Sequence, residues 1–275
     1  MTNIFNYIER KSPIHELTGA TKLACLLLWS FAAMTTFDTR LLAAMPIASF
    51  VLFAISKIKL KDVSFMLWFT FVFLVLNNLL IFLFAPEHGV SIYGTRHVLF
   101  EIIGRYIVTS EQLFYHLNLV LKYFATIPIV LLFVSTTNPS EFAASLNKIG
   151  VSYKISYSVS LALRYIPDIQ REYHDISQSQ QARGIEMSKK ERLSKRLRSA
   201  SKIILPLIMS SMDKIEIIAN AMELRGFGKD KKRTWYMSRK FRATDYISII
   251  LCALLFVFSL LLNFVNHGRY YNPFI

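Results

Sequence analysis

The stretch FMLWFTFVFLVLNNLLIFLF, Phe65 to Phe84, runs for 20 residues without a charged side chain. A helix rises about 1.5 Å per residue, so a run of this length crosses the roughly 30 Å hydrocarbon core of a bilayer. The whole chain agrees with this indication, because 53% of its 275 residues are hydrophobic and only 18% are charged. This composition is typical of a protein that crosses a membrane several times.

Outside this stretch, four further apolar segments have the length or composition of membrane spans. They are Lys22 to Phe37, Leu41 to Ser56, Gln112 to Val134 and Tyr246 to Val265. The sequence therefore predicts an all-α polytopic membrane protein with about five transmembrane helices. The first two segments are short and separated by Asp-Thr-Arg, which favours a helical hairpin, although a pair of re-entrant or interfacial helices stays open. We expect Lys122, inside the fourth segment, to face the bundle or water rather than to mark an ion path.

The positive charge is concentrated in one part of the chain. Of the 32 Lys and Arg residues, 21 fall between Ser135 and Thr244, against 10 Asp and Glu, which gives this block a net charge of +11. The short loop KIKLKD at 57–62 is also basic, whereas the loops at 38–40, 85–111 and 267–275 are poor in Lys and Arg. By the positive-inside rule, we expect a multi-pass protein of the cell inner membrane with its N-terminus in the cytoplasm and its C-terminus outside.

The same charge suggests which partners to expect. Lys and Arg near a bilayer contribute about 1 kcal/mol each through anionic headgroups, so membrane lipid is an expected partner. The sequence contains no recognised nucleic-acid-binding module, and we expect no nucleic-acid partner.

We expect three regions: an N-terminal membrane domain at 1–134 with about four spans, a cytoplasmic helical segment at 135–244, and a last transmembrane helix with a tail at 245–275. In the middle region, apolar residues recur at steps of three and four, which predicts two long amphipathic helices. The first seam contains Ile155, Val159, Ala162, Ile166, Ile169, Tyr173 and Ile176, and the second contains Leu205, Ile208, Met212, Ile215, Ala219 and Met222.

Proline and glycine residues mark the expected boundaries within residues 135–244. Pro167 and Pro206 lie inside the two seams and are expected to kink the helices or divide each into two pieces. A shorter helix is expected at NPSEFAASLNKIG, 138–150, with Pro139 in its first turn and Gly150 at its end.

Both long helices are predicted to end in an Arg-Gly pair, in QQARGIE at 180–186 and in AMELRGFG at 221–228. Glycine just past a helix end commonly adopts the left-handed closing conformation, which explains both glycines. An arginine in the last turn complements the helix dipole by about 0.3 to 1 kcal/mol, which is sufficient for a single occurrence. The repetition favours a matched pair of docking tips, since a guanidinium on a rigid helix end binds carboxylates bidentately.

These two motifs, together with SPIHELTGATKL at 12–23 and the order of spans and helices, resemble the transmembrane (T) component of energy-coupling-factor (ECF) transporters, a CbiQ-like permease family. The resemblance implies a scaffold that joins two ABC-type ATPase subunits to a small substrate-binding membrane (S) subunit. It would transmit ATPase motion to that subunit for uptake of a vitamin or a metal.

The resemblance also implies an ATPase-docking site, and the sequence departs from the family pattern at two places. The residues implied to dock the ATPases are Ala182, Arg183, Gly184, Glu223, Arg225 and Gly226. Leu224 stands where the second signature commonly has alanine, which concerns the fit of that tip in its groove. Thr18 and Gly19 stand where an Asp-Pro pair is common.

Other functions find less support in the residues. The chain has no Gly-x-x-x-x-Gly-Lys-Ser/Thr phosphate loop, so we expect the energy to come from another chain. The six histidines are scattered without metal-ligand spacing, and Cys25 and Cys252 lie in apolar segments, so we expect no enzyme activity, no cofactor and no metal site. A conventional ABC permease and a self-sufficient secondary transporter stay open as alternatives. Asn77 and Asn78 would suit a transport path, but such a pair more often forms a helix-to-helix hydrogen bond.

Overall fold

The computed structural model describes residues 12–103, 106–184, 193–229, 234–235, 239–266 and 268–274. The chain divides into two compact units, here called the membrane unit, formed by residues 1–138 and 239–275, and the coupling unit, formed by residues 139–238. The membrane unit contains α1 (Pro13–Glu16), α2 (Gly19–Thr35), α3 (Thr39–Ile55), α4 (Leu60–Phe84), α5 (His88–Tyr93), β1 (Val98–Ile103), β2 (Tyr106–Thr109), α6 (Ser110–Thr136) and α10 (Ala243–Val265). The coupling unit contains α7 (Pro139–Lys148), α8 (Tyr153–Ala182) and α9 (Leu193–Leu224).

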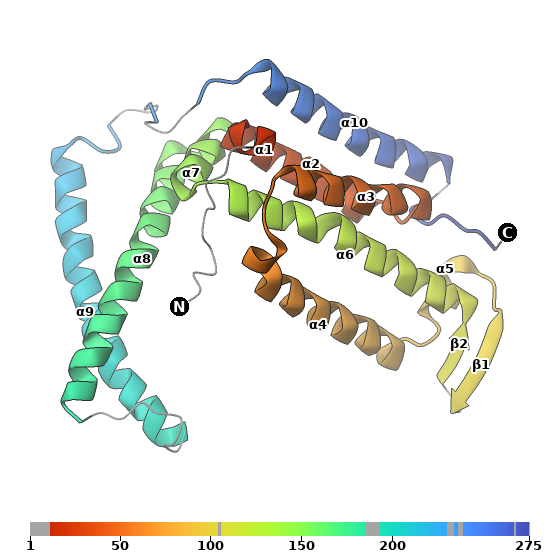
Figure 1. The fold of residues 1–275 in the computed structure, drawn as a ribbon, viewed down its shortest axis with the longest axis horizontal. Coiled ribbons are helices and arrows are strands. Elements are labelled where there is room, and N and C mark those ends of the chain that lie inside the picture. Colours follow the sequence, from red (N-terminus) through yellow and green to blue (C-terminus); the bar gives the residue numbers. More distant parts are fainter. Residues whose placement is uncertain are drawn as a thin grey trace. The chain divides into compact units, whose positions relative to one another are not determined.

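Each of the five predicted apolar segments forms a helix. Within the described residues, Val63–Phe84, α6 and α10 are long and apolar enough to cross a membrane, and α2 and α3 are shorter apolar helices. Helix α2 packs against α10 and α6, while α3 packs against α6, so these four helices lie side by side in Figure 1. The structure confirms the predicted class, a polytopic helical membrane protein.

Small side chains allow these helices to approach closely. Ala32 and Ala33 on α2 and Ala125 on α6 are almost fully buried in a core cluster with Trp29 and Met45. The indole Nε1 of Trp29 donates to the carbonyl oxygen of Ala125 across 2.9 Å. Because lipid tails are as apolar as the helices, close packing and hydrogen bonds of this kind hold a membrane bundle together.

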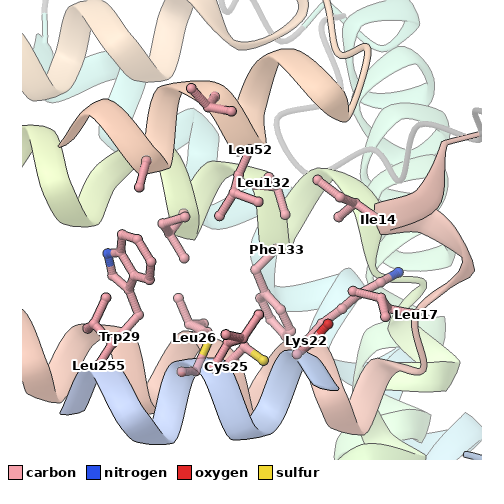
Figure 2. Close-up of a pocket in the computed structure, with 16 residues that line it drawn as sticks. Ile14, Leu17, Lys22, Cys25, Leu26, Trp29, Leu52, Leu132, Phe133 and Leu255 are labelled. Atoms are coloured by element: carbon pink, nitrogen blue, oxygen red, sulfur yellow. The ribbon is translucent and has the colours of Figure 1, made fainter. Parts of the chain in front are cut away.

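Figure 2 shows an apolar cavity of about 530 Å³ bordered by α2, α3, α6 and α10. Cys25 on α2 and Cys252 on α10 both line it, in line with their interpretation as small apolar side chains. Lys22 lies at one end and is buried, and its Nζ donates to the carbonyl oxygens of Thr136 at 2.8 Å and His15 at 3.4 Å. These carbonyl contacts compensate the cost of burying the ammonium.

Hydrogen bonds tie α10 to the rest of the membrane unit at both of its ends. At its start, the buried Asp245 carboxylate accepts from the backbone N–H of Thr18 at 2.9 Å and from that of Arg242 at 2.8 Å. At its other end, Asn266 Nδ2 donates to Asp38 Oδ2 at 2.8 Å. Thr18 also caps α2, because its Oγ1 accepts from the N–H of Thr21. Thr18 is therefore the N-cap residue of α2.

Polar side chains inside the spans serve packing. Asn78 Oδ1 on α4 lies 2.8 Å from His116 Nδ1 on α6, which confirms the expected helix-to-helix hydrogen bond for this asparagine. The ammonium of Lys122 lies 3.2 Å from the centroid of the Phe37 ring and donates to the carbonyl oxygen of Met34 at 3.2 Å. Lys122 thus faces the bundle, as expected.

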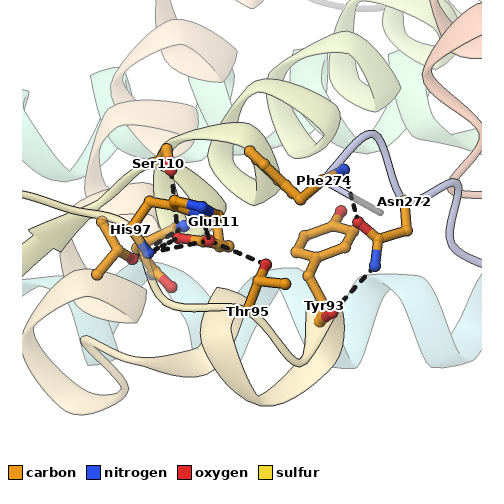
Figure 3. A network of polar contacts seen from close by, with 9 residues as sticks. Tyr93, Thr95, His97, Ser110, Glu111, Asn272 and Phe274 are labelled. Atoms are coloured by element: carbon orange, nitrogen blue, oxygen red, sulfur yellow. Dashed lines mark hydrogen bonds and ion pairs between the residues drawn. The ribbon is translucent and has the colours of Figure 1, made fainter.

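The segment between α4 and α6 contains structure that was not predicted. Strands β1 and β2 pair antiparallel, with Val98 opposite Thr109, and the short helix α5 precedes them. Glu111, at the start of α6, is buried and accepts from Thr95 Oγ1 at 3.0 Å and from the backbone N–H of His97 at 3.1 Å, as Figure 3 shows. These bonds fix the loop before β1 to the start of α6.

The coupling unit follows the predicted helices with one correction. Helix α7 begins at Pro139, and Gly150 after it has a left-handed φ of 107°, as expected. Helices α8 and α9 each continue through their proline, so the expected division into two pieces at Pro167 and Pro206 is wrong, while the alternative of a kink stays a prediction. A proline removes one backbone hydrogen bond and strains one turn, but in helices of 30 and 32 residues the bonds on either side hold the helix together.

Candidate functional site

The first Arg-Gly pair closes α8. Gly184 has a φ of 83°, and its N–H donates to the carbonyl oxygen of Gln181 at 2.9 Å. Arg183 occupies the C-cap position and, like Ala182 before it, is exposed to solvent. The glycine thus turns the chain away, as predicted, and leaves the arginine at the tip of the helix.

The second Arg-Gly pair closes α9 in the same manner. The N–H of Gly226 donates to the carbonyl oxygen of Glu223 at 2.8 Å, and the N–H of Phe227 donates to that of Met222 at 2.9 Å. These two hydrogen bonds, together with the φ of 67° at Gly226, form the Schellman motif. Leu224 is 90% exposed, so it presents an apolar surface beside Arg225.

Helices α8 and α9 cross each other, and their C-terminal ends lie at opposite ends of the crossed pair (Figure 1). At about 1.5 Å per residue, the two helices are about 45 and 48 Å long. The structure therefore keeps Arg183 and Arg225 apart rather than bringing them into one site. Two separate partner grooves match this arrangement, and a single groove does not.

A polar contact joins the two helices across the crossing. Lys214 Nζ on α9 lies 2.8 Å from Glu172 Oε2 on α8, and Ser210 Oγ on α9 donates to Glu172 Oε1. The Glu172 side chain is 17% exposed, against 47% for Lys214. Mainly through the hydrogen bond from Lys214, and also through that from Ser210, these contacts lower the pKa of the Glu172 carboxyl, so it stays ionised. Glu172 and Lys214 belong to neither of the two apolar seams, and the periodicity did not predict this contact.

An aromatic cluster holds the chain that follows the second Arg-Gly pair. The ring of Phe227 lies 4.8 Å from that of Tyr157 and 5.7 Å from that of Tyr153, both on α8. Trp235 extends the cluster, because its ring lies 5.6 Å from Tyr153 and its Nε1 donates to Asn147 Oδ1 at 3.1 Å. The cluster fixes the direction in which the chain leaves α9. The aromatic residues that flank the motif were a usable sequence signal, but no pairing followed from it.

The apolar seams of the two helices are partly open. A groove of about 720 Å³ lies between the helices and is lined by Leu161, Ala162, Tyr165, Ile169, Ile215, Ile218, Ala219, Met222 and Phe227, among others. On α9, Leu205, Met212 and Ile215 are each more than 60% exposed. Contiguous exposed apolar side chains of this kind mark a surface for a protein or a membrane. In the described ranges, no group of three or more His, Cys, Asp and Glu residues is placed to hold a metal ion.

Comparison with known proteins relates this arrangement to a family. Three relatives named energy-coupling factor transporter transmembrane protein EcfT align over nearly the whole chain. The protein from Exiguobacterium sibiricum is 27% identical over 96% of both chains. Those from Streptococcus thermophilus and Staphylococcus aureus are 28% and 26% identical, each over 90% of this chain and 93% and 91% of their own.

The profile of the CbiQ family, described as "Cobalt transport protein", matches residues 10–236. This range begins before α1, includes four of the five apolar helices and continues through both Arg-Gly helix ends. The match covers most of the sequence, and the chain belongs to the CbiQ family.

Proposed function

We propose that this chain, a multi-pass transmembrane subunit of an energy-coupling factor transporter, is the scaffold that converts ATPase motion into movement of a substrate-binding membrane subunit. The observation that carries the proposal is the pair of Arg-Gly helix ends at opposite ends of the crossed helices α8 and α9. In this proposal, residues 139–238 are the cytoplasmic coupling segment, and the N-terminus is cytoplasmic. The transported substrate is a vitamin or a metal, and the chain itself is not an enzyme.

Each helix end docks one ABC-type ATPase subunit. Arg183 and Arg225 insert into grooves on the two ATPases and bind carboxylates or carbonyl oxygens there. Ala182 and Gly184 at one end, and Glu223 and Gly226 at the other, supply the close-fitting backbone around each arginine. Because Leu224 is 90% exposed, the second groove has an apolar wall that matches it.

The crossed pair then works as two rigid rods joined at one point. The Glu172–Lys214 contact and its bond from Ser210 hold the crossing, so displacement of one helix end by its ATPase moves the other parts of both helices. The small S subunit covers the exposed apolar side chains of α9 and the groove between the helices, because these surfaces are costly to leave in water. Closure and reopening of the ATPases on ATP thereby change the position of the S subunit.

Charge reversal at the two tips tests the docking. We expect Arg183→Glu to weaken attachment of one ATPase and Arg225→Glu that of the other, each abolishing uptake while membrane insertion stays intact. Arg171→Glu is the matched control, because Arg171 is 77% exposed on α8 and lies well before the helix end. Unchanged uptake in both tip variants refutes the proposal.

Copurification distinguishes the scaffold from a conventional ABC permease. The tagged full-length chain is extracted from its native membrane in mild detergent, and the bound proteins are identified by mass spectrometry. We expect one or two ATPases together with a small, very hydrophobic membrane protein. Recovery of ATPases alone would favour a permease with its own substrate path, and recovery of the chain alone and folded would contradict coupling.

A further inference from the structure

The membrane unit has a basic hollow of about 320 Å³ at the start of α10. Its lining consists of Glu16, Thr18, Arg239, Lys240, Phe241 and Arg242. Three of these residues are cations, and Glu16 is the single carboxylate among them. The hollow therefore carries a net positive charge and has a defined shape.

The ion pair in the hollow does not use up this charge. Arg242 Nη1 lies 3.6 Å from Glu16 Oε2, and the two side chains are 70% and 71% exposed. An exposed pair at this distance contributes little and leaves most guanidinium donors available to an anion. Arg239 and Lys240 are also exposed.

The backbone around the hollow is held in place by a separate group. Asp245 accepts from the N–H of Arg242 at 2.8 Å and from that of Thr18 at 2.9 Å, and so joins the two segments that form the walls. Asp245 also neutralises part of the positive end of α10, so the attraction for an anion comes from the three cationic side chains rather than from the helix terminus.

The position of the hollow indicates the source of the anion. The apolar span α10 begins at Ala243, directly after Arg242, which places the cations at the level of the lipid headgroups. The rings of Phe241 and Tyr246 pack 5.7 Å apart across this boundary. Aromatic side chains with neighbouring Lys and Arg are typical of the membrane–water interface.

We propose that this hollow binds the headgroup phosphate of an anionic phospholipid. Arg239, Lys240 and Arg242 surround the phosphate, and the Phe241–Tyr246 pair lies against the upper part of the acyl chains. The site is independent of ATPase docking, and it anchors the start of α10, where the chain re-enters the membrane after residues 139–238.

Native mass spectrometry of the full-length chain in neutral detergent tests the site. The probes are phosphatidylglycerol and phosphatidylcholine with identical acyl chains. We expect the wild-type protein to retain phosphatidylglycerol preferentially. Arg239→Gln/Lys240→Gln should reduce that preference about five-fold for each cation removed.

Two further variants separate a specific site from general attraction or misfolding. Lys59→Gln/Lys61→Gln removes the same charge from the start of α4, which lies at the same end of the bundle because Ile14 and Ile58 share one core cluster. It should leave the preference unchanged. Glu16→Gln should strengthen phosphatidylglycerol binding, because it removes a repelling carboxylate, and a misfolded protein would not gain affinity.

Four results would overturn the proposal. An equal loss in both double variants would mean general surface attraction. Weaker binding in Glu16→Gln would contradict the electrostatic argument. Displacement of phosphatidylglycerol by soluble glycerol phosphate at equal concentration would identify a free phosphate site. No effect of Arg239→Gln/Lys240→Gln would show that the lipid binds elsewhere, and an acidic segment of a partner protein would then be the occupant to test for this hollow.

Discussion

Replacement of Asp245 by alanine tests how α10 is attached to the membrane unit. The Asp245 side chain is fully buried, and its two oxygens accept from two different segments. Oδ2 accepts from the N–H of Arg242 and caps α10, whereas Oδ1 accepts from the N–H of Thr18, 227 residues away in the sequence. One carboxylate therefore stabilises a helix start and joins it to the start of α2.

The two bonds set the expected loss of stability. Asp245 is the N3 residue of a capping box whose N-cap is Arg242, and loss of a side chain that caps a helix start costs about 1 kcal/mol, within a range of roughly 0.5 to 2. The N–H of Thr18, a residue that is 3% exposed, would in addition be left buried without its acceptor, which costs about 1 to 3 kcal/mol. We expect Asp245→Ala to lower the free energy of unfolding by about 2 to 4 kcal/mol. Asp245→Asn keeps one acceptor oxygen and should lose about half as much.

The measurement is unfolding of the purified full-length chain in mixed micelles with increasing SDS, followed by far-UV circular dichroism. Ser248→Ala is the matched control, because Ser248 is one turn further along α10, is only half-buried, and donates to Thr244 of its own helix. A loss in Asp245→Ala within about 0.5 kcal/mol of that in Ser248→Ala, the usual size of a surface effect, would refute the reasoning.

Two further predictions concern the coupling unit. The pKa of the Glu172 carboxyl is lowered by Lys214 and Ser210, so the stabilisation that this contact gives to the α8–α9 pair is complete above the ordinary glutamate pKa of about 4.3 and is lost as the pH falls through the lower folded value. The rate of limited proteolysis of the coupling unit, measured at a series of pH values, should show this loss. A Glu172→Gln protein with the same pH dependence would contradict it. Gly226→Ala should destabilise the end of α9 by about 1 to 2 kcal/mol, because alanine disfavours the left-handed φ of this position. The added Cβ would make only an ordinary contact with Lys229, at 3.4 Å, so backbone strain is the cause. Hydrogen exchange should rise in the last turn of α9, and less so in Gly226→Asn; equal exchange in both variants would contradict strain as the cause.

The spans were predictable because each depends on local composition. A run such as Phe65 to Phe84 is apolar on every side, and no soluble fold accommodates such a helix easily. The structure extends these helices by a few residues into polar caps, as at Thr18 and Asp38, which supply side-chain acceptors at the starts of α2 and α3. The caps are local too, so the boundaries differ little from the predicted ones.

The errors arose where two local signals competed. The alternation of β-branched and aromatic residues around Gly104 was a hairpin signal, but it was not used, and β1 and β2 were not predicted. At Pro167 and Pro206, the proline signal was weighted above the helical periodicity on both sides. The structure favours the periodicity, because the bonds of many helical turns outweigh the loss of one bond at each proline.

The candidate site was predictable in part for the same reason. The helix-closing role of Gly184 and Gly226 could be predicted from the residues next to them in the sequence, and their left-handed φ values confirm the predicted helix closure. The Glu172–Lys214 contact depends on how α8 and α9 cross, and residues 42 apart in the sequence leave no periodic signal of their pairing. Whether Arg183 and Arg225 dock the ATPases stays a prediction that the proposed charge reversals test.

The two units differ in how well their polar and apolar side chains suit the surroundings expected for each unit. In the membrane unit, the buried polar groups Asp245, Glu111 and Lys22 all have partners within the chain, and the exposed apolar side chains of α4 and α10 suit a lipid environment. In the coupling unit, α9 is polar on one side and exposes large apolar side chains on the other, which suits neither water nor the lipid interior alone. A helix of this kind suits a surface that a protein or a membrane covers, and in the proposed complex the coupling unit should gain protection from proteolysis when its partners bind. The chemistry of α9 therefore calls for a partner, independently of the Arg-Gly motifs, and both lines of evidence lead to the same part of the chain.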